Sequence, residues 1–275
     1  STNMPPQTIF AGEFTSGNME EVSEETSEVF TDNDQESAEE TEEELSVFTS
    51  ESVPEFSNEA NVMPATVNGE QPIEINLTTP IAPEYSKYYN SRYNCWIINS
   101  GGSYRFNGYG SQTSHPIYIN AGFSNVVIYL NNVNIVTDSN SASALHIESN
   151  NAYIYLENDN YLETRNETNE KHTLEIDPRS CLTTINNSSN NNNGSLTVKS
   201  INSHGIYSYS PLIIDGSSVT ASSRSGIGIG GKSSNITVNG GSVIASSTHG
   251  TGIGGEKSNI TVNGGSVIAS STHGT

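Results

Sequence analysis

Basic residues are absent from the first third of this chain. Residues 1–86 hold 20 of the 31 Asp and Glu residues but no Lys or Arg, and the first base is Lys87. Residues 87–275 carry the other 11 acids and all 10 bases, so the formal charge of −21 lies almost wholly in the first part. Without a basic patch to replace the counterions of a phosphate backbone, the chain is not expected to bind nucleic acid.

Long apolar runs and cysteine clusters are also missing. No segment reaches the roughly 18 consecutive apolar residues that a membrane-spanning helix needs, so we expect no membrane span. The two cysteines, Cys95 and Cys181, have no second Cys or His at metal-binding spacing beside them. A disulfide between turns of a repetitive fold and two buried thiols both stay open. The many Asn, Ser, Thr and Gly residues, with few Lys, favour a secreted or cell-surface protein of a bacterium.

The acidic first part lacks the apolar residues that a core requires. Residues 10–60 are rich in Glu, Ser and Thr, with only scattered Val, Leu and Phe. Like charges repel each other, and too little apolar surface is present to offset the chain entropy lost on folding. We therefore interpret residues 1–86 as a disordered acidic linker or tail, and residues 87–275 as the folded domain.

An unbroken repeat occupies the C-terminal part. The sequence SNITVNGGSVIASSTHGT occurs at residues 234–251 and again, unchanged, at residues 258–275, an offset of 24 residues. The preceding segment matches more loosely at the same offset, with Ile214 aligned to Val238 and Val219 to Val243. Periods of about 20–50 residues are typical of folds in which each unit stacks on the next.

The content of one repeat indicates which stacked fold is present. Apolar residues alternate with polar ones in three short segments that Gly-Gly, Ser-Ser and His-Gly interrupt, and no window has helical periodicity. We predict an all-β fold, a right-handed parallel β-helix (solenoid) with three short strands per 24-residue turn, its hand following from the crossover rule. Because the sequence ends inside a repeat without a polar cap, we expect the solenoid to be truncated at its C-terminal end.

The middle of the chain resembles a known family. The segments that carry the resemblance are G-x-Y at 102–104, the strand pair at 128–135, S-A-L-H-I at 143–147, Y-L-E-T at 161–164, G-S-L-T-V at 194–198 and H-G-I-Y-S at 204–208. Residues 95–222 are similar to secreted bacterial β-helix proteins described as carbohydrate-binding-domain-containing, of the polygalacturonate-binding type. The GIGG and NITVNGG repeats resemble arrays in bacterial surface adhesins. The resemblance implies a secreted glycan-binding module, and it implies calcium without identifying ligands in this chain.

Aromatic side chains are the natural platform for a sugar, because a flat apolar ring stacks on a pyranose while hydroxyl groups reach polar neighbours. We predict that Tyr153, Tyr155, Tyr207 and Tyr209 serve in this way. Trp96 and Phe106 are instead expected to close the first turn of the solenoid as a hydrophobic cap.

The densest acidic cluster of the folded part begins at Glu157. Carboxylate oxygens suit Ca²⁺, and Glu157 and Asp159 would point to the same side of an extended strand. We therefore predict a calcium site at Glu157, Asp159 and Glu163. The alternative is a solvated acidic loop, partly balanced by Arg165, Lys171 and Arg179.

Catalysis is not expected. Glycoside hydrolysis needs two carboxylates facing each other across a groove, and no paired D-D or D-x-D motif is present among the candidate acids. His204, His249 and His273 align with one corner of the solenoid and are interpreted as exposed turn residues rather than metal ligands. The sequence therefore favours a monomeric, non-enzymatic carbohydrate-binding or adhesive module. The structural stalk of an adhesin, and a polysaccharide lyase or hydrolase, are the alternatives.

Overall fold

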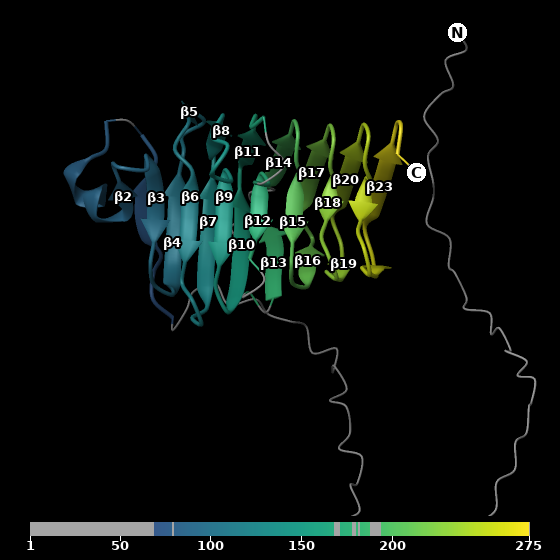
Figure 1. Cartoon of the computed structure of the whole chain (residues 1–275). Helices are drawn as coiled ribbons and strands as arrows, with labels where there is room; N and C mark the ends of the chain where they lie inside the picture. The colour runs from purple at the N-terminus through teal and green to yellow at the C-terminus, as the bar shows by residue number, and fades with distance from the viewer. Residues whose placement is uncertain are drawn as a thin grey trace, which may run out of the picture. The chain divides into compact units, whose positions relative to one another are not determined.

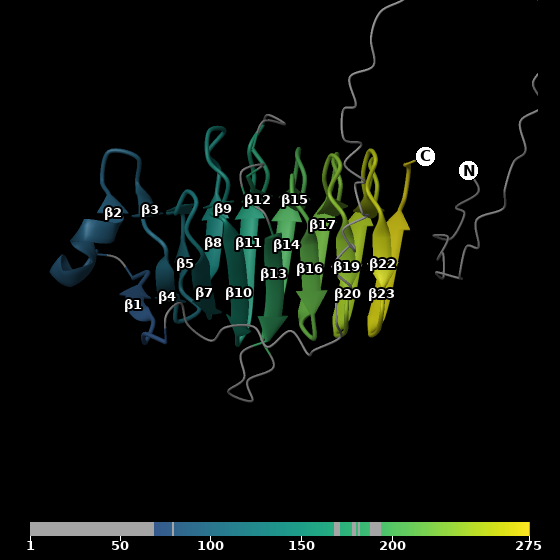
Figure 2. The same ribbon diagram turned by 90° about the horizontal axis from the view of Figure 1, so that it is seen from below.

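The computed structural model describes residues 69–78, 80–167, 171–177, 180, 182–187 and 194–274. In this described part the strands form three sheets, of eight, seven and eight strands. From β3 onward, successive turns of the chain add one strand to each sheet in the same order, so the strands of a sheet follow one another along a single axis (Figure 1). The view from below shows the same stacking from β1 to β23 (Figure 2). The fold is the parallel β-solenoid with three strands per turn that the repeat predicts.

The three sheets are the three faces of the solenoid. The first sheet contains β1 (Ile73–Asn76), β4 (Gly102–Asn107), β7 (Val126–Asn131), β10 (Asn151–Glu157), β13 (Leu182–Asn187), β16 (Leu212–Asp215), β19 (Ile236–Val238) and β22 (Ile260–Val262). The second contains β5 (Gln112–Thr113), β8 (Asn134–Thr137), β11 (Asp159–Thr164), β14 (Ser195–Ser200), β17 (Ser218–Ser223), β20 (Ser242–Ser247) and β23 (Ser266–Ser271). The third contains β2 (Tyr89–Asn90), β3 (Cys95–Ile98), β6 (Ile117–Asn120), β9 (Leu145–Glu148), β12 (Leu174–Ile176), β15 (Ile206–Ser208), β18 (Ile229–Gly230) and β21 (Ile253–Gly254).

Apolar residues stack in the core turn upon turn. In the first sheet the pairing register runs through Ile128, Ile154, Ile185, Ile214 and Val238, and all five side chains are fully buried. Burial of each such side chain stabilises the fold by about 1.5–3 kcal/mol. This ladder is the physical consequence of the period-2 pattern, because the inward position of every turn meets the inward position of the next.

The predicted register of the C-terminal repeat is confirmed. Val238 pairs with Val262 and Val243 with Val267, each at the 24-residue offset. At the corner after the first sheet, the Asn263 side-chain amide donates a hydrogen bond of 2.9 Å to Oδ1 of Asn239 one turn below. The left-handed backbone conformation of this corner falls on a later residue, Gly241, whose φ is +83°. Glycine is needed there because a Cβ would lie 2.1 Å from the carbonyl oxygen of Ser217.

The N-terminal end of the solenoid is closed by aromatic side chains. The 3-10 helix η1 (Pro83–Tyr88) and β2, which pairs antiparallel with β3, bring Tyr85, Tyr88 and Tyr89 against the core. Trp96 is fully buried, and its ring meets Tyr89 edge-on at a centroid distance of 5.1 Å. The expectation that Trp96 and Phe106 are buried at this end is confirmed, since Phe106 is also fully buried.

The domain boundary at residue 87 needs correction within the described residues. Strand β1 already belongs to the first sheet, and Ile75 and Leu77 are buried in the core. The predicted boundary at residue 87 lies at the first basic residue of the sequence. The first strand of the described part lies earlier, at β1, where apolar residues alternate with polar ones. The remaining part of the predicted tail, residues 1–68, lies outside the described residues.

Two further findings bear on the predictions from composition. Cys95 is a free thiol, and Cys181 lies outside the described residues. None of the helices in the described ranges is long and apolar enough to cross a membrane.

Candidate binding face on the third sheet

The third sheet presents polar and aromatic side chains outward in regular ladders. In β6, β9, β12 and β15 the first and third residues face the core and are buried. The second residues form one outward ladder, which consists of Tyr118, His146, Glu175 and Tyr207. The same register, continued by two residues, forms a second ladder of Asn120, Glu148, Asp177 and Tyr209. This surface, which we call the third-sheet face, combines rings, carboxylates and amides.

Two groups of stacked rings lie on the third-sheet face. Tyr118 and His146 stack with their ring centroids 4.4 Å apart. The ring of Tyr207 stacks on His204 at 4.6 Å, lies 4.2 Å from His172, and meets Tyr209 edge-on at 4.9 Å. Tyr209 is the most open of these rings, with 39% of its surface exposed. The ring of Tyr209 is therefore accessible from solvent, next to the packed rings of Tyr207, His204 and His172.

Glu175 lies in the ladder between the two ring groups and is buried. Its carboxylate accepts a hydrogen bond of 2.6 Å from the Ser143 hydroxyl and lies 3.5 Å from Nζ of Lys171. Burial by itself would raise the pKa of Glu175, but interactions with His146, Ser143 and Lys171 outweigh it and lower the pKa to about 2. Glu175 is therefore ionised at neutral pH, as a fixed negative charge rather than a proton donor.

His172 and His204 are uncharged at neutral pH. The pKa of each imidazole is lowered to about 4, by burial in both cases and, for His172, also by the proximity of His204. His204, His249 and His273 share the predicted corner between the second and third sheets, but they do not occupy the same position in it. His249 and His273 pack together at 5.3 Å, whereas His204 lies two residues further along its turn, where its Nδ1 accepts a hydrogen bond from the Ile227 amide. Because Ile206 pairs with Ile229, the counterpart of His204 on the next turn is Ile227.

A pocket of about 520 Å³ adjoins Tyr118 and His146. Its size falls within the range of about 300–1,000 Å³ that is usual for small-ligand sites. The lining comes from β3 and β6 with the residues that precede them, from the end of β8 and the loop after it, from β9, and from the segment before β12: Tyr93, Asn94, Cys95, Ser114, Pro116, Ile117, Tyr118, Thr137, Asp138, Ser139, Ser141, Ala142, Ser143, His146 and Lys171. Hydroxyl groups and two opposite charges therefore surround an aromatic surface, an arrangement that suits a polyhydroxylated ligand.

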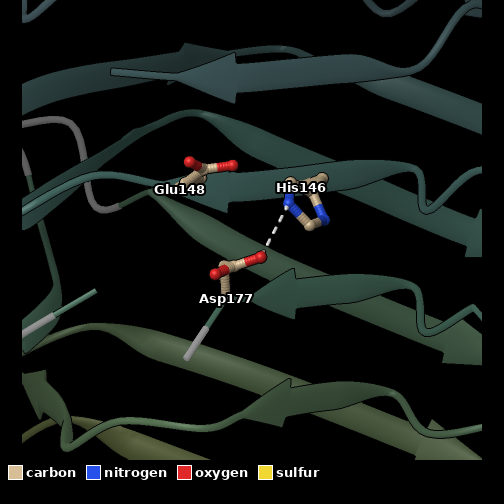
Figure 3. A group of neighbouring side chains, drawn as sticks. All are labelled: His146, Glu148 and Asp177. Carbon is tan, nitrogen blue, oxygen red and sulfur yellow. Dashed lines mark ion pairs between the residues drawn. The ribbon is translucent and has the colours of Figure 1, made fainter. Parts of the chain in front are cut away.

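His146, Glu148 and Asp177 come together at the border between the two outward ladders (Figure 3). One nitrogen or oxygen atom from each residue lies within 4.8 Å of the others. Nε2 of His146 is 3.7 Å from Oδ2 of Asp177, and Nδ1 of the same ring is 3.8 Å from Oε1 of Glu175.

The four tyrosines predicted for sugar stacking lie on two different sheets. Tyr207 and Tyr209 belong to the third-sheet face described above. Tyr153 and Tyr155 lie on β10 of the first sheet, where the ring of Tyr155 stacks on Tyr129 at 5.0 Å and only 6% of Tyr155 is exposed. The pairs therefore do not form one platform, and the open ring is that of Tyr209.

The three carboxylates predicted for calcium do not converge. Glu157 ends β10 and Asp159 begins β11, and between them Asn158 has a φ of +57°, so the backbone turns a corner instead of continuing straight. Arg105 binds the Glu157 carboxylate through Nε and Nη2, at 3.1 and 3.2 Å. Glu163, on the second sheet, pairs with Arg165 at 2.9 Å. These residues do not fit a shared calcium site, and Glu170 and Arg179 of the same cluster lie outside the described residues.

The sequence contains a signal for the third-sheet face that motif reasoning missed. The segments IYIN at 117–120, LHIE at 145–148, LEID at 174–177 and IYSY at 206–209 share one alternation. The spacing between these segments changes from one turn to the next. A search at a fixed offset therefore does not align Tyr118, His146 and Glu148 with Tyr207 and Tyr209.

The fold defines a class, a three-sided parallel β-solenoid, and one of its faces is polar and aromatic. The family model of the carbohydrate-binding domain-containing proteins matches residues 93–274, more than half of the chain. The chain belongs to that family. No curated protein and no solved structure matches it.

Proposed function

We propose that the chain is a monomeric, non-catalytic carbohydrate-binding module, located outside the cell, whose glycan site is the third-sheet face with its adjoining pocket. Membership of the carbohydrate-binding domain-containing family supports the ligand class. The observation that carries the location of the site is the pocket of about 520 Å³ beside the stacked Tyr118 and His146.

The chemistry of the face favours stacking and hydroxyl recognition. A pyranose ring packs on an aromatic face, while its hydroxyl groups exchange hydrogen bonds with polar neighbours. In the pocket, the exposed ring of Tyr93 supplies an aromatic face. Hydrogen-bonding groups for the sugar hydroxyls come from Ser139, Ser141 and Asp138. The near balance of 11 acids and 10 bases over residues 87–275 favours a weakly charged glycan.

The ionised state of Glu175 agrees with a protein that binds glycans without hydrolysing them. Glycoside hydrolysis needs a carboxylic acid that holds its proton at the working pH. Because the pKa of Glu175 is lowered to about 2, this residue is unsuited to the acid role. The lyase or hydrolase alternative predicts release of reducing ends or unsaturated uronates, so we expect neither product when the chain is incubated with polysaccharides.

A glycan array followed by calorimetry tests the proposal. The panel includes polygalacturonate, because the sequence resembles polygalacturonate-binding proteins, together with neutral polysaccharides and runs with CaCl₂ or EDTA. Tyr93→Ala removes a pocket ring that is 64% exposed, and Tyr109→Ala removes a ring that is 62% exposed but does not line the pocket. Loss of one stacking ring costs about 1–2 kcal/mol, or roughly 5–30-fold in affinity. We expect this loss with Tyr93→Ala alone.

A structural stalk is the second candidate function. It is favoured by the C-terminal turns, in which β17, β20 and β23 stack at an unbroken 24-residue offset. If no glycan binds the wild-type chain, or if Tyr93→Ala and Tyr109→Ala behave alike, the proposed glycan site is wrong and the stalk is the better account. The proposal for an extracellular location is tested by protease treatment of intact cells, which should degrade the protein.

A further inference from the structure

We propose that His146, Glu148 and Asp177 form a binding site for one divalent transition-metal ion of the zinc type. The proposal is independent of carbohydrate binding, because it rests on the geometry of these three side chains and their neighbours. It also differs from the calcium site predicted at Glu157, Asp159 and Glu163, which uses none of the same residues.

Two adjacent turns of the solenoid bring the three side chains together. His146 and Glu148 are two residues apart on β9, so both point outward from the same strand. Asp177 follows β12 directly, and the pairing of Ile147 with Ile176 places it beside Glu148 on the next turn. Neighbouring strands are about 4.8 Å apart, which keeps the donor atoms within reach of one ion. The backbone ladder therefore fixes the spacing of the site.

The Nε2 atom of His146 is free of hydrogen bonds and can bind an ion. The side chain of His146 is buried, with 6% of the residue exposed, and its Nε2 has no hydrogen-bond partner. Oδ2 of Asp177, at 3.7 Å, is too distant for a hydrogen bond. A buried nitrogen without a partner destabilises a fold, and a bound cation would satisfy it.

The surroundings hold the imidazole in the orientation that a metal ligand requires. Nδ1 faces the carboxylate of Glu175 at 3.8 Å, which favours a proton on Nδ1 and leaves the lone pair on Nε2. Metal-binding histidines commonly direct their second nitrogen at a carboxylate in this way. Glu175 is itself held by Ser143 and Lys171, and the stack on Tyr118 fixes the plane of the ring.

The donor set selects the type of metal. One imidazole nitrogen and two carboxylate oxygens suit zinc and similar ions, whereas Ca²⁺ prefers oxygen ligands alone. Zinc bonds of about 2.0–2.2 Å imply donor atoms about 3.4 Å apart, so separations of 3.7 to 4.8 Å require side-chain shifts of only about 1 Å. Three protein ligands leave a fourth position for water or another small ligand.

Calorimetric titration of the full-length, EDTA-stripped chain with ZnCl₂ at pH 7 tests the site, without any glycan present. We expect one equivalent of tight binding in the wild type, and affinity lowered at least about tenfold by His146→Gln, Glu148→Gln and Asp177→Asn. A millimolar concentration of Ca²⁺ should leave this binding unchanged. With Co²⁺ as the probe, the visible absorption should intensify as water ligands are replaced, and His146→Gln should abolish that change.

The controls separate this site from other metal binding by the chain. His249→Gln alters the exposed pair of His249 and His273, and should leave zinc affinity unchanged. The 20 acidic residues of residues 1–86 remain in every variant, so weak binding to them is common to all titrations. Circular dichroism identifies any variant that fails to fold, and Asp177→Asn, at the end of a strand, provides an independent measurement. Equal zinc affinity in the wild type and in the folded site variants, or a loss confined to His249→Gln, overturns the proposal.

Discussion

The imidazole of His146 lies flat on the phenol ring of Tyr118, with 8° between the ring planes. The two residues face each other across β6 and β9, and their contact depends on how one turn of the solenoid rests on the next. The same stack borders the pocket and orients the imidazole beside Glu148 and Asp177. The register of these two strands therefore determines the geometry of both proposed sites.

The contact between Tyr118 and His146 should be measurable as a coupling energy. Stacked aromatic pairs contribute about 0.5–1.5 kcal/mol beyond the area they bury. We expect a double-mutant cycle with Tyr118→Leu and His146→Leu to give a coupling in this range, from urea unfolding in EDTA followed by circular dichroism. A coupling near zero would mean that the rings do not contact each other in solution.

The core ladder should be far more sensitive to truncation than the outer surface. Ile154 is fully buried between Ile128 and Ile185. We expect Ile154→Ala to lower the free energy of unfolding by about 2–5 kcal/mol, through lost burial and the cavity left behind. Ile268→Ala, at a half-exposed position on β23, is the matched control and should cost less than about 1 kcal/mol. Similar losses for the two variants would contradict the assignment of the core.

Glu175 should stabilise the fold in a manner that depends on pH. Its pKa is lowered from 4.5 to about 2, so the folded state favours the ionised form, and the stabilisation is complete above about pH 5. It should decline as the pH falls from 4.5 towards 2. We expect Glu175→Gln to lose about 2–3 kcal/mol at pH 7 and less at pH 3, measured by urea unfolding of both proteins at each pH. A difference that does not change with pH would refute this account.

His172 and His204 should destabilise the fold in mild acid. Each imidazole has a folded-state pKa near 4 against an ordinary value of 6.5, so the unfolded chain binds protons first as the pH falls. Stability should therefore be complete above about pH 6.5 and fall between pH 6.5 and 4, by about 1–3 kcal/mol for each residue.

Asparagine variants provide the control for that prediction. In the wild type, Nδ1 of His172 contacts the Ser203 hydroxyl, and Nδ1 of His204 accepts a hydrogen bond from the Ile227 amide. In the double variant His172→Asn/His204→Asn, a side-chain oxygen can take the place of each of these nitrogens. Its unfolding free energy should vary less than that of the wild type between pH 6.5 and 4. His249→Gln, at an exposed position, should leave the wild-type pH profile intact, and identical profiles for all three proteins would rule out the assignment to His172 and His204.

The solenoid was predictable because its information is local and repeated. The alternation around Ile236 and Val238 predicts a strand, and its recurrence after 24 residues predicts the partner strand, as the pairing of Val238 with Val262 confirms. The same reasoning works for Ile128 and Ile154, which are paired at an offset of 26. The start of the fold at β1 was missed, because Ile75 and Leu77 are too few to reveal a strand amid acidic residues.

The candidate site was only partly predictable. The sequence marks Tyr207 and Tyr209 as aromatic residues in or beside a strand, but no pattern in it separates them from Tyr153 and Tyr155, which lie on a different sheet. The corner at Asn158 likewise separates Glu157 from Asp159, although an extended strand would have kept them together. A single residue in a left-handed conformation changes which side chains share a face.

The sequence by itself determined that short strands stack in parallel, which residues face the core, and that residues 87–275 have a net charge close to zero, because each of these follows from local alternation and composition. Only the tertiary structure decided that His146 and Glu148 meet Asp177 beside Tyr118. Turns of unequal length lie between these strands, and the offset from one turn to the next is set by how each loop closes. The contacts that make a binding site across turns therefore depend on register, which emerges when the core packs.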